Sequence, residues 1–431
     1  MRSIREMLRG NLLIFTLGDV MRQLSMFITF PFFSLYIQAL GGNTITIGLV
    51  NGLRPIAAFF IYPIAGFIAD RYSRVKIIVA TGFLSSALFL IYMLAPDWRT
   101  LAIGNLLMGL VVFHFPAMNS LMADSLPPGR RGVGYSLWRT FPGVIGILSP
   151  YIGGYLITIF GIKRAMRVLY FLTIAMTLGI TVMYYKFLSE TQKRVGLSTT
   201  SPLRVVSDSY REMFKVLKWM PNSLKAFSAM LILSFLINNV AVPFWVVYGI
   251  EEIGLSELQW GTALLIAAFV NVALLVPAGM IVDRFAVKKV LALSLALSAV
   301  PVFLFPFSRG LLDTALMLVA VTIANTFLFS GAPTFMAISV PKEMRGRVMA
   351  ALGQGMLFIN ILGMTGGPGM GAILTVPSVL GALIGGFIYS FDPKLPWMLL
   401  ATSLLLNAGI AAVFIKTSKR EIGKNLQEDY I

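Results

Sequence analysis

Long stretches without charged residues constrain this chain of 431 residues more than any other feature. A helix that crosses a lipid bilayer needs about 20 mostly apolar residues. Seven stretches free of Asp, Glu, Lys and Arg reach that length on their own: Ile77–Pro96, Thr100–Ala123, Thr140–Ile162, Ala226–Ile250, Leu258–Val282, Thr314–Pro341 and Leu395–Ile415. These stretches predict an all-α integral membrane protein.

Further apolar segments bring the expected number of spans to twelve. Shorter runs lie at 168–185 and 290–308, and the N-terminal part supplies helices over 11–40 and 44–69. The uncharged stretch Val348–Phe391 has 44 residues, longer than one crossing needs, and we count it as one. The basic N-terminus leads directly into the first helix without a cleavage site, so we expect no cleaved signal peptide.

The distribution of Lys and Arg predicts the orientation of these helices. With the N-terminus in the cytoplasm, the inner segments hold 26 of the 35 basic residues and the outer segments hold six, as the positive-inside rule requires. A second crossing within Val348–Phe391 would move the basic C-terminal residues outside. The net charge of +17 is therefore a topology signal, and we expect no nucleic-acid partner. The predicted location is the cell membrane, with both termini cytoplasmic.

Three short motifs recur at nearly one displacement, which indicates that six helices were duplicated in parallel orientation. The pairs, displaced by 213, 214 and 212 residues, are Gly66-x-x-x-Asp70-Arg71 with Gly279-x-x-x-Asp283-Arg284, Pro127-x-x-x-Arg131-Gly132 with Pro341-x-x-x-Arg345-Gly346, and Pro31-Phe32-Phe33-x-x-Tyr36 with Pro243-Phe244-Trp245-x-x-Tyr248. We expect six-helix bundles over 1–188 and 226–431. The linker 189–225 is expected to be cytoplasmic, with an amphipathic helix on the inner membrane surface.

These motifs resemble those of a known family. The stretch from Gly66 to Lys76 resembles the signature of the major facilitator superfamily between helices 2 and 3, with Ser73 in place of one Gly. Ser149-Pro150-Tyr-Ile-Gly153-Gly154 is similar to the helix 5 motif of drug:proton antiporters, whereas Asn105 replaces the Arg of their helix 4 motif. The resemblance implies twelve helices in two pseudo-symmetric halves that transport by alternating access.

The Gly- and Arg-containing inner turns are the candidate conformational gate. A Gly lets two helices approach closely, an Asp can face a helix N-terminus, and Arg side chains offer ion pairs. The alternative is that these charges only anchor turns at the membrane surface. The candidates are Gly66, Asp70, Arg71, Arg74, Lys76, Gly279, Asp283, Arg284, Arg131 and Arg345.

Asp19 is the acidic residue that lies clearly inside a predicted span. An ionised group at that depth is costly and usually functional. Arg22 and Gln23 follow at i+3 and i+4 on the same helix face, so Asp19 and Arg22 can form an ion pair. Together with His114 they are our candidate proton-coupling residues. The alternatives are a static ion pair and a His that is simply hydrogen-bonded.

Other polar and aromatic residues within the spans are candidates for a substrate cavity. Arg54 and Arg139 can bind an anionic substrate group or neutralise Asp19. The Asn residues can line a cavity or join helices, and the aromatic residues can gate, stack on substrate or simply pack. The set comprises Arg54, Arg139, Phe33, Tyr36, Asn238, Asn239, Trp245, Asn271, Asn325 and Asn360. The Gly-rich run 363–371 either interrupts helix 11 or forms a loop.

Together these features predict a secondary transporter that exports small amphipathic, drug-like molecules against an inward flow of protons. We expect no cofactor and no resident metal, since the chain has no Cys and one His, and no enzymatic site. The expected partners are substrate, protons and membrane lipids, with the chain acting as a monomer. The alternatives are the same fold with an anionic metabolite, a metal ion or a lipid as cargo, or a non-transporting membrane sensor.

Overall fold

The computed structural model describes two compact helical units. The described residues are 10–126, 142–191, 211, 219–341, 344–362 and 370–416, without the side chains of Pro63, Gly66, Phe67, Asp70, 345–347 and 350. They contain helices and connections but no strand. Within these described ranges, twelve helices are long and apolar enough to cross a membrane, which confirms the predicted fold class and number of spans. By internal contacts, unit 1 comprises Met1–Asp208 with Ser256–Leu265, and unit 2 comprises Ser209–Leu255 with Ile266–Ile431.

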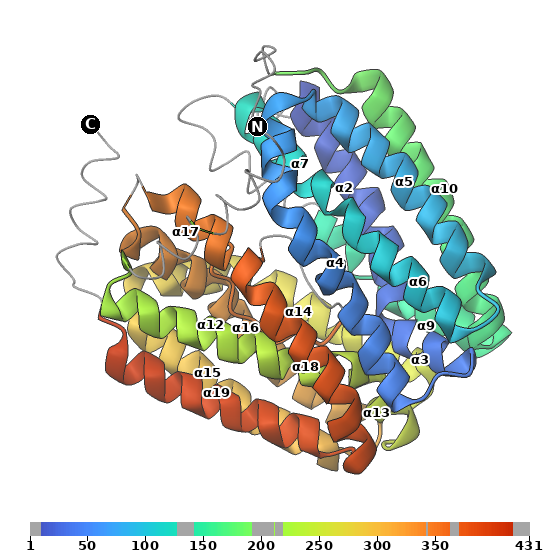
Figure 1. Cartoon of the computed structure of the whole chain (residues 1–431). Coiled ribbons are helices and arrows are strands. Elements are labelled where there is room, and N and C mark those ends of the chain that lie inside the picture. Colours follow the sequence, from blue (N-terminus) through green and yellow to red (C-terminus); the bar gives the residue numbers. More distant parts are fainter. Residues whose placement is uncertain are drawn as a thin grey trace. The chain divides into compact units, whose positions relative to one another are not determined.

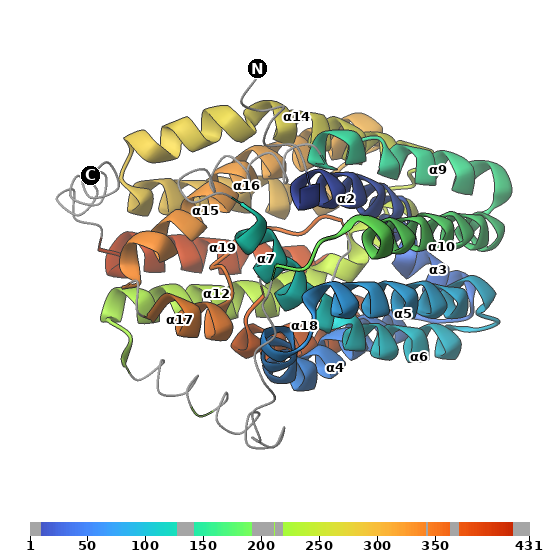
Figure 2. The same ribbon diagram turned by 90° about the horizontal axis from the view of Figure 1, so that it is seen from above.

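Unit 1 runs from blue to green in Figure 1. Helix α10 packs against both α2 and α5 (Figure 2), while α4 packs against α6 and η2. Its elements are α2 (Gly10–Thr29), η1 (Phe30–Phe32), α3 (Phe33–Ala39), α4 (Thr44–Arg71), α5 (Arg74–Leu94), α6 (Trp98–Met108), η2 (Gly109–Phe113), α7 (His114–Ser125), α9 (Ser149–Phe160) and α10 (Ile162–Phe187).

Unit 2 follows the same plan from light green to red in Figure 1. Helix α15 packs against α16 and α19, and α12 packs against α18 and α19. Its elements are α12 (Asn222–Ala241), η3 (Val242–Phe244), α13 (Trp245–Glu251), α14 (Glu257–Arg284, of which the residues after Leu265 belong here), α15 (Val287–Leu304), η4 (Phe305–Phe307), α16 (Leu311–Ser339), α17 (Arg345–Leu352), α18 (Ala372–Phe391) and α19 (Leu395–Phe414).

Local side chains explain where several helices begin. The carboxylate of Asp97 accepts hydrogen bonds from the backbone N–H and the hydroxyl of Thr100, both at 3.0 Å, at the start of α6. The side chain of Asn43 does the same for the N–H of Thr46 at 2.9 Å, at the start of α4. Such caps satisfy N–H groups that have no partner within the helix. The capping residues lie in the short polar turns that separate consecutive membrane helices.

The duplicated Pro motif produces the same local structure in both units. Pro31 and Pro243 each lie in a 3₁₀ turn, η1 and η3, that interrupts the first span of its unit. A Pro cannot donate a backbone hydrogen bond, which favours such a break. One turn later, the hydroxyl of Tyr36 donates to the carbonyl of Tyr92 at 3.0 Å, and that of Tyr248 donates to the carbonyl of Pro306 at 2.8 Å. The internal repeat therefore extends from sequence to side-chain hydrogen bonding.

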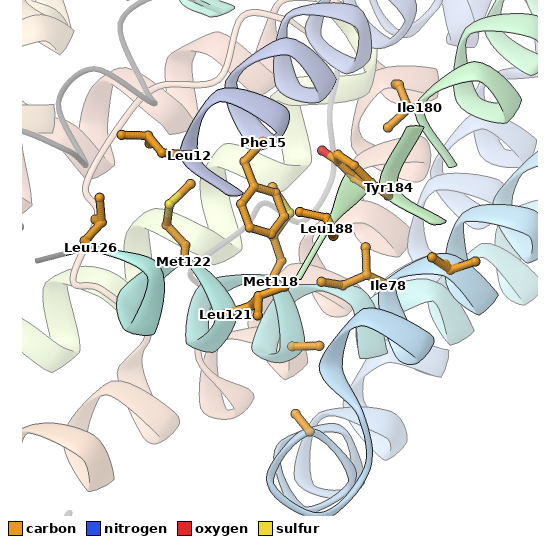
Figure 3. Packing of buried hydrophobic residues seen from close by; sticks show 13 residues of the cluster. Leu12, Phe15, Ile78, Met118, Leu121, Met122, Leu126, Ile180, Tyr184 and Leu188 are labelled. Carbon is orange, nitrogen blue, oxygen red and sulfur yellow. The ribbon is translucent and has the colours of Figure 1, made fainter. Parts of the chain in front are cut away.

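A cluster of buried apolar side chains packs one end of α2 within unit 1 (Figure 3). The rings of Phe15 and Tyr184 meet edge to face, with centroids 5.6 Å apart. Met118 and Leu121 of α7 and Ile78 of α5 pack into the same cluster. The cluster holds the turn of α2 that immediately precedes Asp19 in the sequence.

Large apolar side chains also cover the outer surface of the helices. On α15, Leu293, Leu297 and Val300 are 61%, 57% and 57% exposed, at a spacing that places them on one face. Continuous exposed apolar surface of this kind is typical of helices that contact lipid rather than water.

The eleventh span, α18 (Ala372–Phe391), is one continuous helix that follows a short helix and a non-helical segment. Helix α17 ends at Leu352, residues 353–362 are not helical, and α18 begins at Ala372. Gly353 and Gly355 have φ angles of 71° and 69°, in the left-handed region that favours glycine, so the helix ends there. The non-helical segment thus begins before the Gly-rich run, of which residues 363–369 lie outside the described part of the chain, and the eleventh span begins after it.

Candidate substrate and proton sites

The ion pair expected on α2 is present. Arg22 Nε donates to Asp19 Oδ1 at 2.8 Å, with the carboxylate side chain 7% exposed and the guanidinium side chain 33% exposed. Arg22 also contacts the sulfur of Met26 at 3.8 Å. Gly18 lies directly against the hydroxyl end of Tyr184, where a Cβ would overlap the Tyr ring. The turn of α2 that carries Asp19 therefore packs against α10, while part of the Arg22 side chain stays exposed.

His114 lies near this pair at the start of α7. Its Nδ1 is 3.3 Å from the hydroxyl of Thr81 on α5, and its Nε2 is 3.1 Å from the sulfur of Met118. Arg22 is close enough to interact with it electrostatically. The fourth candidate of this group, Gln23, lies instead against Gly146, where a Cβ would come within 2.6 Å of its side chain. Three of the four proton-coupling candidates thus come together.

The residue that replaces the antiporter Arg in helix 4 has a structural role in unit 1. Asn105 donates to the carbonyl of Val50 on α4 at 2.6 Å and accepts from the hydroxyl of Tyr92 on α5 at 3.0 Å. It therefore joins three helices with neutral hydrogen bonds. One turn beyond Val50 on α4, Arg54 interacts electrostatically with Tyr62 and Tyr92. Arg139, the other candidate cation for the substrate cavity, lies outside the described residues.

The aromatic candidates are packed in buried clusters in both units. In unit 1, Phe33 and Tyr36 join Tyr92 and Tyr170, with centroids 5.7 Å apart for Phe33–Tyr92 and 5.9 Å for Tyr36–Tyr170. In unit 2, Trp245 lies 4.5 Å from Phe305 and 5.7 Å from Trp397. The three candidates Phe33, Tyr36 and Trp245 are each 6% exposed or less.

Two Asn side chains hold the non-helical segment 353–362, which precedes the eleventh span. Asn325 of α16 accepts from the N–H of Ile359 at 2.8 Å and donates to its carbonyl at 3.0 Å. Asn238 of α12 accepts from the N–H of Asn360 at 3.2 Å and donates to the carbonyl of Phe358 at 3.4 Å. Each amide thus pairs with the peptide backbone as a neighbouring strand would. Irregular backbone at membrane depth is tolerated only where protein satisfies it in this way.

The remaining Asn candidates make other contacts. Asn271 of α14 donates to the hydroxyl of Thr326 on α16 at 3.0 Å, and Asn239 donates to the carbonyl of Phe235 on its own helix at 2.7 Å. Asn360 accepts from the N–H of Leu362 at 3.0 Å. Beside the non-helical segment lies a cavity of about 10 Å³, lined in part by Ser234, Asn238, Phe358 and Ser403. It has room for about one water molecule.

The gate candidates of unit 1 show partners that the sequence did not indicate. Arg74 forms an ion pair with Asp124 at the end of α7. Glu190, which follows α10, accepts from the hydroxyl of Ser73 at 2.6 Å and from the N–H of Val75 at 3.2 Å. Asp124 lies at the end of one span, and Glu190 follows the end of another. An acidic residue at such a position was the sequence signal that could have indicated these partners.

The other gate candidates are placed less fully. Arg71 ends α4 and is partly buried, whereas Lys76 is exposed. In unit 2, Asp283 and Arg284 are exposed at the end of α14, where Gly279 also lies. The side chains of Asp70 and Arg345 are not described, nor is the surrounding of Gly66, and Arg131 lies outside the described residues.

The fold and these sites define a class of protein: an integral membrane protein of duplicated helical bundles with charged and amide groups inside its spans. The sequence profile of the Major Facilitator Superfamily matches residues 15–364. The chain belongs to this superfamily of membrane transporters, which confirms the resemblance of its motifs.

Relatives and solved structures agree with this assignment. An uncharacterized MFS-type transporter of Methanocaldococcus jannaschii is 22% identical over 422 residues, covering 95% of each chain. The multidrug resistance protein MdtG of Yersinia enterocolitica is 25% identical and covers 79% of this chain and 82% of its own. The nucleoside transporter NupG has the same fold, with a TM-score of 0.69, 13% identity, and coverage of 95% and 100%. The human organic anion transporter MFSD10 also shares the fold, with a TM-score of 0.63, 13% identity, and coverage of 93% and 98%.

Proposed function

We propose that this transporter exports small amphipathic organic molecules across the cell membrane by alternating access, driven by protons that enter the cell. The observation that carries the proposal is the ion pair of the buried Asp19 with the partly buried Arg22, 2.8 Å apart within a membrane span. Relatives that are named as multidrug resistance proteins support the class of cargo. The substrate and protons are its functional partners, both termini are cytoplasmic, and the chain acts as a monomer.

The pair supplies a simple means of coupling. While Asp19 is ionised, its carboxylate is bound by Arg22 and the two charges compensate each other. A proton that binds Asp19 removes the negative charge, so the guanidinium is released to other partners, with His114 and Tyr184 nearby. A proton that moves inward down 100 mV supplies about 2.3 kcal/mol. Transport is coupled to protons if the protonated form of Asp19 favours one access state of the transporter and the ionised form favours the other.

The inner turn of unit 1 is the proposed conformational gate. Arg74 pairs with Asp124, and Glu190 binds the start of α5 through Ser73 and Val75. These contacts hold the start of α5 to the ends of α7 and α10. A surface ion pair such as that of Arg74 and Asp124 is worth at most about 1 kcal/mol. A contact of this strength can break and reform during transport.

The test is transport in proteoliposomes with a pH gradient, using the cationic dye rhodamine 123 and the anionic dye fluorescein side by side. Wild-type protein should accumulate at least one dye only when the gradient is present. Asp19→Asn should still exchange labelled for unlabelled dye but should not concentrate it. Asp313→Asn makes the same chemical change at a helix end, where Asp313 binds the N–H of Arg309, and should behave as wild type. Gradient-driven accumulation by Asp19→Asn at the wild-type rate would show that Asp19 does not couple transport to protons.

A second cargo class has structural support. Arg54 adds a positive charge inside a span, beyond the compensated pair, and this favours a substrate with an acidic group. Transport of fluorescein but not rhodamine 123 in the same assay would favour this alternative.

A further inference from the structure

A close contact between the first and fifth spans of unit 1 recurs in unit 2. In unit 1, a Cβ at Gly153 of α9 would lie 2.5 Å from the carbonyl oxygen of Ile28 on α2. In unit 2, a Cβ at Gly385 of α18 would lie 2.7 Å from the carbonyl oxygen of Val240 on α12. Ile28 and Val240 are 212 residues apart, which is the displacement of the repeated Pro-Phe motif. The two glycines therefore occupy corresponding positions in the duplicated bundle.

Unit 2 contains additional residues before this glycine. The Pro that begins the repeated Pro-x-x-x-Arg-Gly motif lies 26 residues before Gly153 in unit 1 but 44 residues before Gly385 in unit 2, a difference of 18. Between these points the backbone of unit 2 comes back to one place, because a Cβ at Gly371 would lie 2.2 Å from the N atom of Gly353. The chain thus departs at Gly353 and is beside it again at Gly371, which accounts for the extra length.

The non-helical segment 353–362 is the described part of this additional stretch, and it lies near the middle of the spans. Asn325 binds both the N–H and the carbonyl of Ile359, at 2.8 and 3.0 Å. Asn238 accepts from the N–H of Asn360 at 3.2 Å. Both Asn side chains come from the middle of their own membrane spans. The backbone that they hold is therefore at the depth of the membrane midplane.

Burial alternates along this segment with a period of two residues. The odd-numbered residues from 353 to 359 are buried, whereas the even-numbered residues from 354 to 360 are partly exposed. Extended backbone turns successive side chains to opposite faces, so one face packs within unit 2 and the other is left open. We call the second set the open face; it consists of Gln354, Met356, Phe358 and Asn360.

The open face at this depth is expected to meet water rather than lipid. Non-helical backbone within a membrane is found where protein buries it or where it lines a water-filled cavity, because lipid cannot satisfy its polar groups. The buried face of the segment meets the first condition, and the open face indicates the second. Irregular backbone near the midplane also forms the substrate sites of many transporter folds.

The surroundings of the open face carry no charge over a long stretch. Phe235 of α12 meets Phe358 edge to face, with ring centroids 6.4 Å apart. The two helices that hold the segment contain no Asp, Glu, Lys or Arg after Lys225 in α12 and after Asp313 in α16. Aromatic and Met side chains suit flat apolar bodies of varied shape, and amides offer donors and acceptors without charge. This chemistry favours a neutral ligand.

We propose that the open face is part of the substrate site and binds neutral amphipathic molecules that have an aromatic body. This inference rests on the proposed transport function and names its substrate class. Met356 and Phe358 contact the aromatic body, and the amides of Gln354 and Asn360 bind its neutral polar groups. The Asn side chains of α12 and α16 are positioning groups, because they bind the backbone of the segment rather than the substrate.

Single cysteines test the placement in the full protein, because the chain has no Cys of its own. In phosphatidylcholine nanodiscs, a membrane-impermeant methanethiosulfonate reagent modifies the thiolates that water reaches. Met356→Cys and Phe358→Cys should react at least about tenfold faster than Leu357→Cys, with Ile359→Cys as slow as the last. Val300→Cys is the lipid-facing control, since Val300 is 57% exposed on α15, and it should stay unreactive. If Phe358→Cys does not fold, Met356→Cys still decides.

Protection by ligands tests the substrate class. The probes are 7-amino-4-methylcoumarin, which is neutral at pH 7, and the charged dyes fluorescein and rhodamine 123. At four times its half-saturating concentration, the coumarin should slow the modification of Met356→Cys by about fivefold, as occupancy of one site requires. The two charged dyes should protect less at equal concentration. Arg99→Cys places a thiol at an exposed turn of unit 1, where it should react quickly with or without each probe.

The outcomes distinguish this inference from the proposed function. Equal reactivity along the segment, or alternating reactivity that the coumarin does not slow, overturns the inference; gradient-driven transport of a dye would still leave the export proposal standing. Protection by a charged dye but not by the coumarin overturns the neutral substrate class. Alternating reactivity with coumarin protection, but without gradient-driven transport of any probe, supports the site and counts against the export proposal.

Discussion

The two units share a scaffold but differ in the polar groups that they bury. In both, a Pro-containing 3₁₀ turn and a Tyr hydroxyl bound to a distant carbonyl organise the first span of the unit. Unit 1 then buries charge, in the pair of Asp19 and Arg22 and in Arg54. Unit 2 buries neutral amides, which bind the backbone of the non-helical segment before α18.

This difference shows what a duplicated bundle can change without losing its fold. Both units retain the aromatic packing and the Pro-containing 3₁₀ turns, because these features depend on the shape of the side chains. The interior polar groups are free to diverge, provided that each finds a partner. Charges suit the proposed coupling, whereas Asn amides can supply the hydrogen bonds that a non-helical backbone lacks. The proposed coupling therefore belongs to unit 1, and the non-helical segment held by amides belongs to unit 2.

The largest effect that would test this comparison lies in unit 1. Asp19→Ala leaves the partly buried Arg22 without its partner inside a span and should lower the free energy of unfolding by about 3 kcal/mol. Arg22→Ala should do the same for Asp19. The double variant Asp19→Asn/Arg22→Gln should recover part of this loss, because neither charge remains. Thermal or denaturant unfolding in detergent measures all four proteins, and a double variant less stable than the sum of the single losses would contradict a compensated pair.

The next effect concerns the amides of unit 2. Asn325→Ala leaves the N–H and carbonyl of Ile359 without these partners, which should cost about 2 kcal/mol. Asn239→Ala is the matched control, because its amide binds only the carbonyl of Phe235 on its own helix and its Oδ1 makes no hydrogen bond to described residues. We expect Asn239→Ala to cost less than about 1 kcal/mol. Equal losses in the two variants would remove the special role given to Asn325.

A smaller and symmetric effect is expected from the shared scaffold. Tyr36→Phe and Tyr248→Phe each remove one buried hydrogen bond, of 3.0 Å and 2.8 Å respectively. Each should lower unfolding stability by about 1 kcal/mol, with similar values in both units. Unequal losses, with one variant neutral, would indicate that the repeat has diverged here as well. The same unfolding assay distinguishes the two results.

The smallest effect is a pH dependence at the surface. Hydrogen bonds from Thr100 hold the pKa of Asp97 below its usual value, so the ionised carboxylate stabilises the start of α6. Because the pKa is lower in the folded protein, this contribution is present above the unfolded value of about 3.9 and is lost as the pH falls through the folded value. Asp97→Asn should flatten the pH dependence of stability below about pH 4. An unchanged acid limb in this variant would mean that other carboxylates dominate it.

Sequence reasoning found the elements whose signals are local. Helix spacing placed Asp19 and Arg22 on one face, and the pair forms between residues three apart. The repeated Pro-containing motif was visible in the sequence, whereas the 3₁₀ turn that it forms in each unit was found only in the structure. Sequence reasoning did not find Asp124 and Glu190 as partners of the inner turn, because each joins helices 50 residues or more apart in sequence. Asn105 matched an antiporter position, but its hydrogen bonds to Val50 and Tyr92 follow only from the packing of three helices.

Hydropathy, charge distribution and internal repetition are sufficient to establish the number of spans, the duplication and the family of this chain. Each depends on residue type along the chain, because the bilayer requires apolar length and satisfied backbone from every span. Only the tertiary structure decided which polar groups meet. Asn238 and Asn360 are 122 residues apart, and Asn325 and Ile359 are 34 apart. No local pattern specifies such partners, because a buried amide accepts any peptide group that packing brings within hydrogen-bond distance.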